Sequence, residues 1–233
     1  EASGILPNHP WHKKLEAYWD VSEDAAHKCL QTFIELGIGD YKKGRDFPSK
    51  KHVSRLSPYL RHGQISPSQI WDAVDDLPQD DNVAHFKSEL GWREFSYYLL
   101  YHYPHLPKQN LQPKFDRFQW THNADMLKAW QRGETGIPIV DAGMRELYET
   151  GYMHNRSRLI TSNFLNRMLG MDWRLGEIYF ARKLTDYDPS VNNGNWQWVS
   201  SVGVDPKPYF QRLFNPMLQS EKFDSNAKYI KKW

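Results

Sequence analysis

Apolar residues recur every three or four positions along most of the chain, and strict alternation of apolar and polar residues is rare. The first spacing puts side chains on one face of an α-helix, whereas alternation is typical of a β-strand. The pattern therefore predicts an all-α fold. Helices are expected over about 11–36, 83–103, 155–170 and 174–184, and the longest loop over 103–119, which is rich in Pro, Gln and Lys.

Local start and stop signals add further helix boundaries. The dipeptides Ser-Pro at 66–67 and Asp-Pro at 188–189 each join an N-capping side chain to a proline suited to the first turn of a helix. Gly151 closes a segment that begins near Pro138, and glycine commonly ends helices because it adopts positive φ. No repeat or clear linker divides the chain, so one helical domain is expected.

The composition stands out in its aromatic content. The 233 residues include 10 Trp, 13 Tyr and 11 Phe, yet the mean hydropathy is only −0.77. Aromatic side chains fill protein cores, and they also stack on flat heteroaromatic ligands. The 30 basic and 28 acidic side chains nearly cancel, so the net charge of +2 says little about partners.

Several classes of protein are excluded or disfavoured. Cys29 is the only cysteine, which excludes an internal disulfide and a multi-cysteine metal site and favours a reducing compartment. The sequence has no apolar run long enough to span a membrane and no signal-peptide pattern. The sequence has no Walker-type glycine loop. It also lacks HExxH, which disfavours a zinc enzyme, and GxSxG, which disfavours a serine hydrolase.

Basic side chains cluster between Tyr41 and His62. This segment contains seven Lys or Arg residues and a single acidic residue, Asp46. Such a cluster can neutralise phosphates, and Ser54 and Ser57 add hydroxyl donors. A solvated basic loop has the same composition, so the pattern leaves both interpretations open.

The segment FKSELGWREF places an acid, a tryptophan and an arginine on one side of its helix. Phe86, Glu89, Trp92 and Arg93 fall at i, i+3, i+6 and i+7. They can line a pocket together, or Glu89 and Arg93 can form a surface ion pair of minor energetic value. The spacing alone does not separate these alternatives.

The segment GYMHNRSRLI divides its polar residues between two directions. Asn155, Arg158 and Leu159 share a helix face, and Arg156 is rotated by about 100° from them. One helix can therefore aim a polar pair inward and a guanidinium toward a partner. His154 invites a catalytic interpretation, but a lone histidine is more often structural.

The segment LTDYDPSVNNGNWQW has the most distinctive polar face. Asp188, Asn192 and Trp196 follow at i, i+4 and i+8, and Asp186 lies just outside the helix, where an arginine from elsewhere can meet it. A carboxylate, a carboxamide and an indole on one face suit a heteroaromatic ligand rich in donors and acceptors. Trp198 lies two residues from Trp196, so the two indoles must point in different directions.

Taken together, these segments resemble the FAD-binding helical domain of the DNA photolyase/cryptochrome family, with class I cyclobutane pyrimidine dimer photolyases as the nearest group. The most diagnostic strings are ELGWREF, TGIPIVDAGMRELYETGYMHNRSR, DWRLGEIYFARKLTDYDPSVNNGNWQW and FNPMLQSEKFDSNAKYIKKW. The similarity covers 41–233, and 1–40 fits a helical lead-in to that domain. The resemblance further implies that the family's antenna domain is absent and that the sequence stops before the family's usual C-terminal end.

The resemblance implies a U-shaped FAD, active as the fully reduced anion. Asn192 would lie near flavin N5, and Arg158 and Asp186 would form a salt bridge over the ring. Val53 stands where the family usually has threonine, so the loss of a hydroxyl predicts weaker FAD binding. The positions that match the family's cofactor contacts are Tyr41, Ser54, Arg55, Leu56, Ser57, Phe86, Arg93, Asn155, Arg158, Asp186, Asp188 and Asn192.

The resemblance also implies damaged DNA as the partner and light-driven electron transfer to a cyclobutane pyrimidine dimer as the reaction. Glu89, Trp92, Asn155 and Trp198 match the catalytic pocket that receives the flipped dimer, and Arg45 and Arg156 match contacts to the DNA backbone. Trp120, Trp173 and Trp196 match a chain of electron carriers to the flavin. A monomer without metal or membrane partner is expected, located in the cytoplasm or with the nucleoid.

Two positions separate groups within the family. The (6-4) photolyases carry histidines where this chain has Asn155 and Leu159, whereas cyclobutane-dimer enzymes commonly have methionine at the position of Leu159. Dimer repair is therefore the leading hypothesis. The alternatives are a cryptochrome-type photoreceptor that does not repair DNA and a DNA-binding fragment that has lost flavin.

Overall fold

The structure, a computed structural model, describes residues 10–208 and 211–233. Within these ranges the fold is all-α, as predicted, and contains no strand longer than the isolated bridge between Thr121 and Met171. The helices are α1 (Trp11–Glu16), α2 (Glu23–Leu36), α3 (Tyr41–Gly44), α4 (Ser57–His62), α5 (Pro67–Asp75), α6 (Asp81–His102), α7 (Ala124–Arg132), α8 (Pro138–Thr150), α9 (Asn155–Asn163), α10 (Trp173–Lys183), α11 (Pro189–Ser200), α12 (Pro216–Phe223) and α13 (Lys228–Lys232). Short turns of 3₁₀-helix occur at η1 (Ile38–Asp40) and η2 (Pro113–Arg117), and a π-helical turn at η3 (Phe164–Met168).

The predicted helix boundaries at the capping signals are confirmed. Ser66 accepts a hydrogen bond from the backbone N–H of Gln69, and the Gln69 side chain accepts one from the backbone N–H of Ser66, so α5 begins with a complete capping box. Asp188 caps α11 in the same position before a proline. Gly151 ends α8 with φ of +67°, a conformation that favours glycine.

The single helix predicted over 11–36 is wrong, because the chain forms α1 and α2 with a bend between them. Ser22 interrupts the helix by accepting a hydrogen bond from the backbone N–H of Ala25, which makes it the N-cap of α2. The connection also holds Trp19, whose indole N–H donates to the carbonyl of Thr150 over 2.7 Å. Apolar periodicity continues through this bend, so the pattern alone does not reveal it.

The helix predicted over 155–170 is α-helical only to Asn163 and continues as η3. The predicted loop over 103–119 contains η2 and is anchored in the core by Gln197. The Gln197 amide donates to the carbonyls of Leu106 and Gln109 over 2.8 and 2.9 Å. Gln197 lies between Trp196 and Trp198 in the chain, so neighbouring residues of α11 make contacts on different sides of the helix.

The apolar core consists of two clusters. One contains buried residues between Ala26 and Leu90, from α2 to α6, and the other contains residues between Trp130 and Val202, from α7 to the end of α11. Because α2 shares a cluster with residues of 41–90, its packing provides no break at residue 40. The division into 1–40 and 41–233 stays a prediction.

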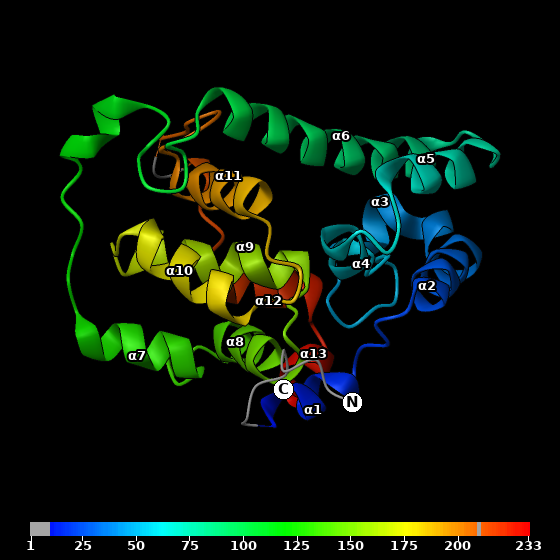
Figure 1. The fold of residues 1–233 in the computed structure, drawn as a ribbon. Helices are drawn as coiled ribbons and strands as arrows, with labels where there is room; N and C mark the ends of the chain where they lie inside the picture. The colour runs from blue at the N-terminus through cyan, green and yellow to red at the C-terminus, as the bar shows by residue number, and fades with distance from the viewer. Residues whose placement is uncertain (1–9, 209–210) are drawn as a thin grey trace.

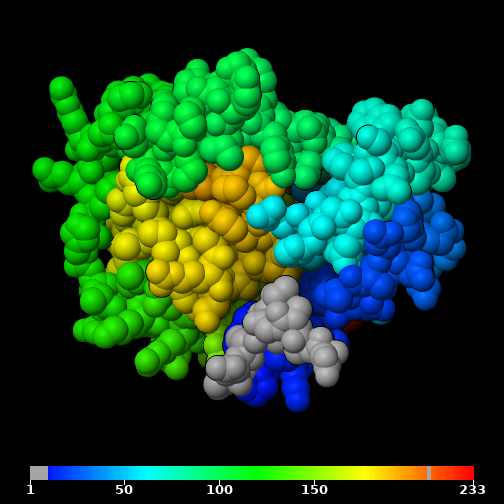
Figure 2. All heavy atoms as spheres, in the orientation of Figure 1, coloured from blue at the N-terminus to red at the C-terminus, as the bar shows by residue number. Residues whose placement is uncertain are grey.

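Helix α6 contributes residues to the first apolar cluster and also packs against α11, which belongs to the second. Figure 1 shows α6 lying across α11 and extending to α5, while α8, α13 and α1 gather at the opposite side of the molecule. Figure 2 shows the cyan α4 region in contact with the yellow-to-orange segment that precedes α11. The contacts there include Arg61 with the carbonyl of Tyr187 and His62 with that of Thr185, 3.0 Å away. Segments that are far apart in the sequence, one from each half of the chain, are therefore in contact here.

Within the described ranges, none of the helices combines the length and apolar character needed to cross a membrane.

Candidate functional site

A cavity of about 290 Å³ opens between the segment 53–61, α6 and the helices α9 to α11. This volume lies at the lower end of the range found for small-molecule sites. All twelve positions predicted to contact a cofactor line this one cavity. They come from α3, the strap formed by residues 53–56 together with the start of α4, α6, α9, the segment 184–188 and α11. They are separated by up to about 150 residues, so only the tertiary fold brings them together.

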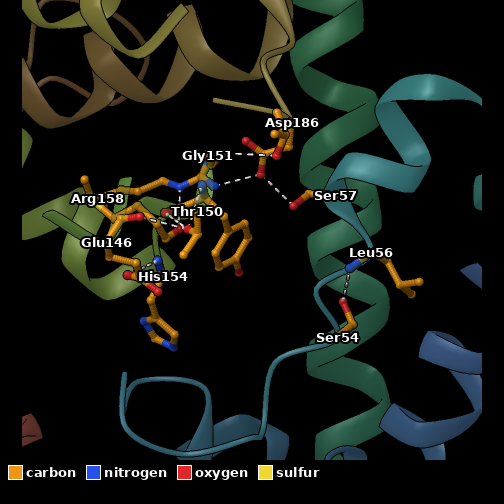
Figure 3. A network of polar contacts seen from close by, with 12 residues as sticks. Ser54, Leu56, Ser57, Glu146, Thr150, Gly151, His154, Arg158 and Asp186 are labelled. Carbon is orange, nitrogen blue, oxygen red and sulfur yellow. Dashed lines mark hydrogen bonds and ion pairs between the residues drawn. The ribbon is translucent and has the colours of Figure 1, made fainter. Parts of the chain in front are cut away.

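An ion pair predicted from the resemblance is present in the cavity wall. Arg158 Nη2 donates to Asp186 Oδ2 over 2.7 Å, and Ser57 Oγ donates to the same oxygen over 2.6 Å (Figure 3). Burial works to lower the pKa of Arg158, but the Asp186 carboxylate outweighs it and raises that pKa. The side chain of Asp186 is only 2% exposed, and its Oδ1 has no hydrogen-bond partner in the described part of the chain.

Both carboxylate oxygens of Asp188 accept hydrogen bonds from the protein. Its Oδ1 accepts from the backbone N–H groups of Ser190 and Val191 over 2.9 and 3.2 Å, and its Oδ2 accepts from the Tyr97 hydroxyl. Burial alone would raise the pKa of Asp188, but these hydrogen bonds and that of the Ser190 hydroxyl lower it. Arg93 donates in turn to the Tyr97 hydroxyl over 3.1 Å. Asp188 is therefore an ionised anchor that ties α11 to α6.

Glu177 is a site residue that the sequence reasoning missed. Its Oε1 accepts from the Asn192 amide over 3.1 Å and from the Tyr187 hydroxyl over 3.2 Å, and burial raises its pKa. One N–H of the Asn192 amide is thus engaged, and the amide oxygen is available to a ligand. The sequence did contain a signal, because Glu177 lies on the same helix face as the buried Trp173 and Phe180.

The paired tryptophans separate as the spacing predicted. Trp196 is 3% exposed and lines the cavity, whereas Trp198 lies outside the cavity wall with the Arg212 guanidinium 3.8 Å from its ring centroid. Trp92, also outside the cavity wall, is 61% exposed on α6. Trp92 and Trp198 therefore do not contribute to the enclosed volume, and their predicted role in the pocket that receives the flipped dimer stays a prediction.

Two residues predicted to contact the DNA backbone are held by internal carboxylates. Arg45 is ion-paired with Glu89, which lines the cavity, and Arg156 lies 2.5 Å from Asp46. Their side chains are only 13% and 14% exposed. Of the two alternatives for Glu89 and Arg93, the surface ion pair is not formed, since Arg93 contacts the neighbouring Glu94, and both residues line the cavity. Both arginines are thus held by contacts within the protein, and their contact with DNA stays a prediction.

The three tryptophans predicted to carry electrons share one apolar cluster. Trp173 and Trp196 are buried members, and Trp120 packs against the cluster from its edge. The Trp173 indole donates to the Asn110 side chain over 2.9 Å, which holds its orientation. Of the three, Trp196 lines the cavity, and the electron-carrier role of all three stays a prediction.

His154 has a structural role at the start of α9. Its Nδ1 accepts from the backbone N–H of Arg156 over 3.1 Å, and its own backbone N–H donates to the Glu146 carboxylate over 3.1 Å (Figure 3). Burial, reinforced by nearby arginines, lowers the pKa of His154 from the ordinary 6.5 to about 3. The neutral imidazole therefore caps the helix that carries Asn155 and Arg158.

This lowered pKa predicts acid lability. Between pH 6.5 and about 3 the unfolded chain binds a proton at His154 that the folded chain does not, so stability is lost as the pH falls through this window. The loss should reach about 2 kcal/mol by pH 5. His154→Asn retains a capping acceptor without the titration and should remove that contribution from urea unfolding curves measured between pH 7 and pH 5. The exposed His105→Asn is the control, and an unchanged pH slope in His154→Asn would contradict the assignment.

No group of three or more His, Cys, Asp or Glu side chains suited to a metal ion occurs within 10–208 and 211–233.

Comparisons with known proteins agree with this geometry. The family model described as the FAD binding domain of DNA photolyase matches residues 86–233. A deoxyribodipyrimidine photo-lyase of Agrobacterium fabrum is 45% identical over 98% of this chain and 48% of its own length. A class III photolyase structure from Agrobacterium tumefaciens has a TM-score of 0.93 at 45% identity, over 98% of this chain and 48% of that one. A cryptochrome structure from Synechocystis has a TM-score of 0.85 at 32% identity, over 93% and 46%. The chain thus spans about half the length of the curated relatives it matches.

Proposed function

Because the chain belongs to the DNA photolyase/cryptochrome family and contains its FAD-binding domain, we propose that it binds FAD in the cavity and acts in the light-driven repair of cyclobutane pyrimidine dimers. The observation that carries this proposal is the convergence of all twelve predicted cofactor positions on one cavity. The names of the curated relatives support the reaction class. The nearer relation to class I enzymes stays a prediction, since a class III structure is similar over nearly the whole chain.

The residues present fit FAD in their chemistry. The free Oδ1 of the buried Asp186 is an acceptor facing no protein donor among the described residues, and a flavin or ribose N–H or O–H would satisfy it. Asn192 presents an amide oxygen, and Arg55 with Ser54 and Ser57 presents charge and hydroxyl donors that suit phosphates. When bound and reduced, FAD would supply the electron that light drives onto the dimer.

The chain's own residues would bind and orient the two partners. Arg158 and Asp186 place opposite charges beside the cofactor cavity, where they influence the charge state of a bound group. Glu89 and Asn155 line the cavity and would offer hydrogen bonds to base edges. Trp92 and Trp198 offer flat apolar surfaces for an unstacked dimer, which costs less to extrude than an intact base pair.

The proposal is tested in two steps. The purified protein is first mixed with FAD and its absorption spectrum is recorded after removal of free cofactor; retained flavin bands are expected, and a colourless protein would reject the cofactor assignment in favour of the flavin-free DNA-binding alternative. The reduced, FAD-loaded protein is then illuminated with dimer-containing single-stranded and duplex DNA, with a dark sample as control. Dimers are expected to disappear only under light. Unchanged dimer content in both DNA forms would reject repair.

A second candidate function is that of a cryptochrome-type photoreceptor without repair. Two observations favour it: the similarity to the Synechocystis cryptochrome and the internal pairing of Arg45 and Arg156, which occupies the predicted DNA contacts. This function predicts light-driven reduction of bound flavin without preference for dimer-containing DNA. Binding assays with matched damaged and undamaged oligonucleotides separate the two functions.

Trp196→Phe is expected to leave FAD binding in place but to reduce the light-driven reduction of oxidised flavin to a small fraction of the wild-type rate, because Trp196 is the buried tryptophan in the cavity wall. Transient absorption after blue-light excitation measures that rate. Trp71→Phe, on the half-exposed surface of α5, is the control and should keep it. Equal rates in Trp196→Phe and wild type would contradict the electron-carrier assignment.

A further inference from the structure

Arg55 has an unusual backbone conformation for a side-chain-bearing residue. Its φ is +55°, in the left-handed region that favours glycine. It lies in the strap that precedes α4, is exposed, and lines the cavity. Such a conformation persists when surrounding contacts over-determine it, and it occurs often where a side chain must be aimed at a ligand.

Two aromatic rings hold the Arg55 guanidinium. Its Cζ lies 4.6 Å from the ring centroid of Trp19 and 4.9 Å from that of Tyr152, and the two rings are 5.7 Å apart. Both distances are within the range of cation–π attraction. Because the two ring centroids are only 5.7 Å apart, both rings lie toward one side of the guanidinium, and N–H groups on its other side are left for another partner.

Trp19 is itself fixed in place, although it lies outside the family-model match. Its indole donates to the Thr150 carbonyl over 2.7 Å, and its ring packs against Tyr59 at 6.3 Å. The Tyr59 hydroxyl donates to the Asp20 carbonyl over 2.9 Å, which ties the bend between α1 and α2 to α4. The connection between α1 and α2 is therefore attached to α8 through Trp19 and to α4 through Asp20.

Arg55 has no direct ion-pair partner among the described residues, and the charged group that acts on it from a greater distance is Glu146. Across residues 10–208 and 211–233 no carboxylate forms an ion pair with it. Burial raises the pKa of Tyr152 to about 12, so this ring is neutral near pH 7 and serves as an aromatic surface, not as a counter-ion. Its ring also contacts Arg158 at 5.2 Å, but that guanidinium already has Asp186 as its partner.

We propose that Trp19 and Tyr152 are positioning residues that hold Arg55 toward the diphosphate of the cofactor. This inference rests on the proposed binding of FAD and adds that retention depends on the bend between α1 and α2, a segment expected from sequence to be only a lead-in. The contacts with the two rings offset the unfavourable backbone conformation of Arg55. The guanidinium, which has no direct ion-pair partner among the described residues, would then contact the anionic part of the ligand.

The test is a double-mutant cycle on FAD affinity, measured by equilibrium titration followed by flavin fluorescence. Trp19→Leu is expected to weaken FAD binding about tenfold, the effect of losing one well-placed cation–π contact. Arg55→Ala is expected to weaken it at least as much. In the Arg55→Ala background, Trp19→Leu should have almost no further effect, because the residue it positions is gone.

Two variants separate positioning from general stability. Trp19→Phe retains a ring face for the guanidinium and should recover most of the affinity lost in Trp19→Leu. Trp71→Leu removes an indole that also carries a cation, with Lys87 at 4.9 Å, but lies outside the cavity and should leave FAD affinity unchanged.

Equal weakening by Trp19→Leu in the presence and absence of Arg55 would overturn the inference while leaving FAD binding intact. The same conclusion would follow if Trp19→Phe bound FAD as poorly as Trp19→Leu. Failure of the wild-type protein to bind FAD would instead overturn the proposed function and the inference together.

Discussion

Asp186→Ala is expected to be the most damaging single substitution in the site. Removal of this carboxylate leaves the Arg158 guanidinium in the cavity wall without its counter-ion, and the Ser57 hydroxyl without its acceptor. The loss of one partner of a buried ion pair typically costs about 3–5 kcal/mol. Urea unfolding at pH 7 measures the loss, and absorption after gel filtration with FAD should show little retained flavin.

Two variants calibrate this result. Asp186→Asn keeps the shape and one acceptor oxygen, so its stability should lie between wild type and Asp186→Ala. Asp75→Ala removes the partner of Lys87 from a pair in which the acid is 61% exposed, and such pairs are worth about 0–1 kcal/mol. If Asp186→Ala were no less stable than Asp75→Ala, the ion pair with Arg158 would have no special energetic role.

Gly176→Ala is expected to have the second-largest effect, because there is no room for a methyl group. A Cβ at this position would lie 2.1 Å from Cη2 of Trp196 and 2.7 Å from Cδ2 of Leu165, both buried. Overpacking of this kind typically costs about 1–3 kcal/mol. Because the clash is with Trp196, the substitution should also shift that ring in the cavity wall and slow light-driven flavin reduction.

Gly91→Ala is the matched control. Gly91 lies in the interior of α6, and a Cβ there would meet no atom within 4 Å. Alanine in place of an exposed helical glycine usually stabilises a protein by about 0.5–1 kcal/mol. Opposite signs for the two glycine variants in thermal unfolding are therefore expected, and destabilisation of equal size by both would contradict the packing argument for Gly176.

The secondary structure could be predicted in part from local signals, whereas the helices α3, α4, α7, α12 and α13 were not predicted. The Asp-Pro start of α11 and the terminal glycine of α8 are effects within a few residues, so they can be recognised in the sequence. The bend before α2 escaped recognition because the apolar spacing continues through it, while the interactions that produce it include one long-range hydrogen bond from Trp19 to Thr150.

The site could be predicted in part. Asp188, Asn192 and Trp196 share a helix face, so spacing alone brought them together, and family resemblance added Arg158 as the partner of Asp186. Glu177, which orients Asn192, was missed. It belongs to a different helix, and its importance appears only when α10 packs against α11.

The sequence by itself determined the helical class, several helix boundaries and the identity of many polar residues that line the cavity, because these depend on local capping, on apolar spacing and on motifs that are continuous in the chain. Only the tertiary structure decided the partners: Glu177 for Asn192, Asp46 for Arg156, and Trp19 for Arg55. Hydrogen bonds, ion pairs and ring contacts between distant segments depend on distances of a few ångströms. Those distances exist only after two hydrophobic clusters have packed and brought the segments together.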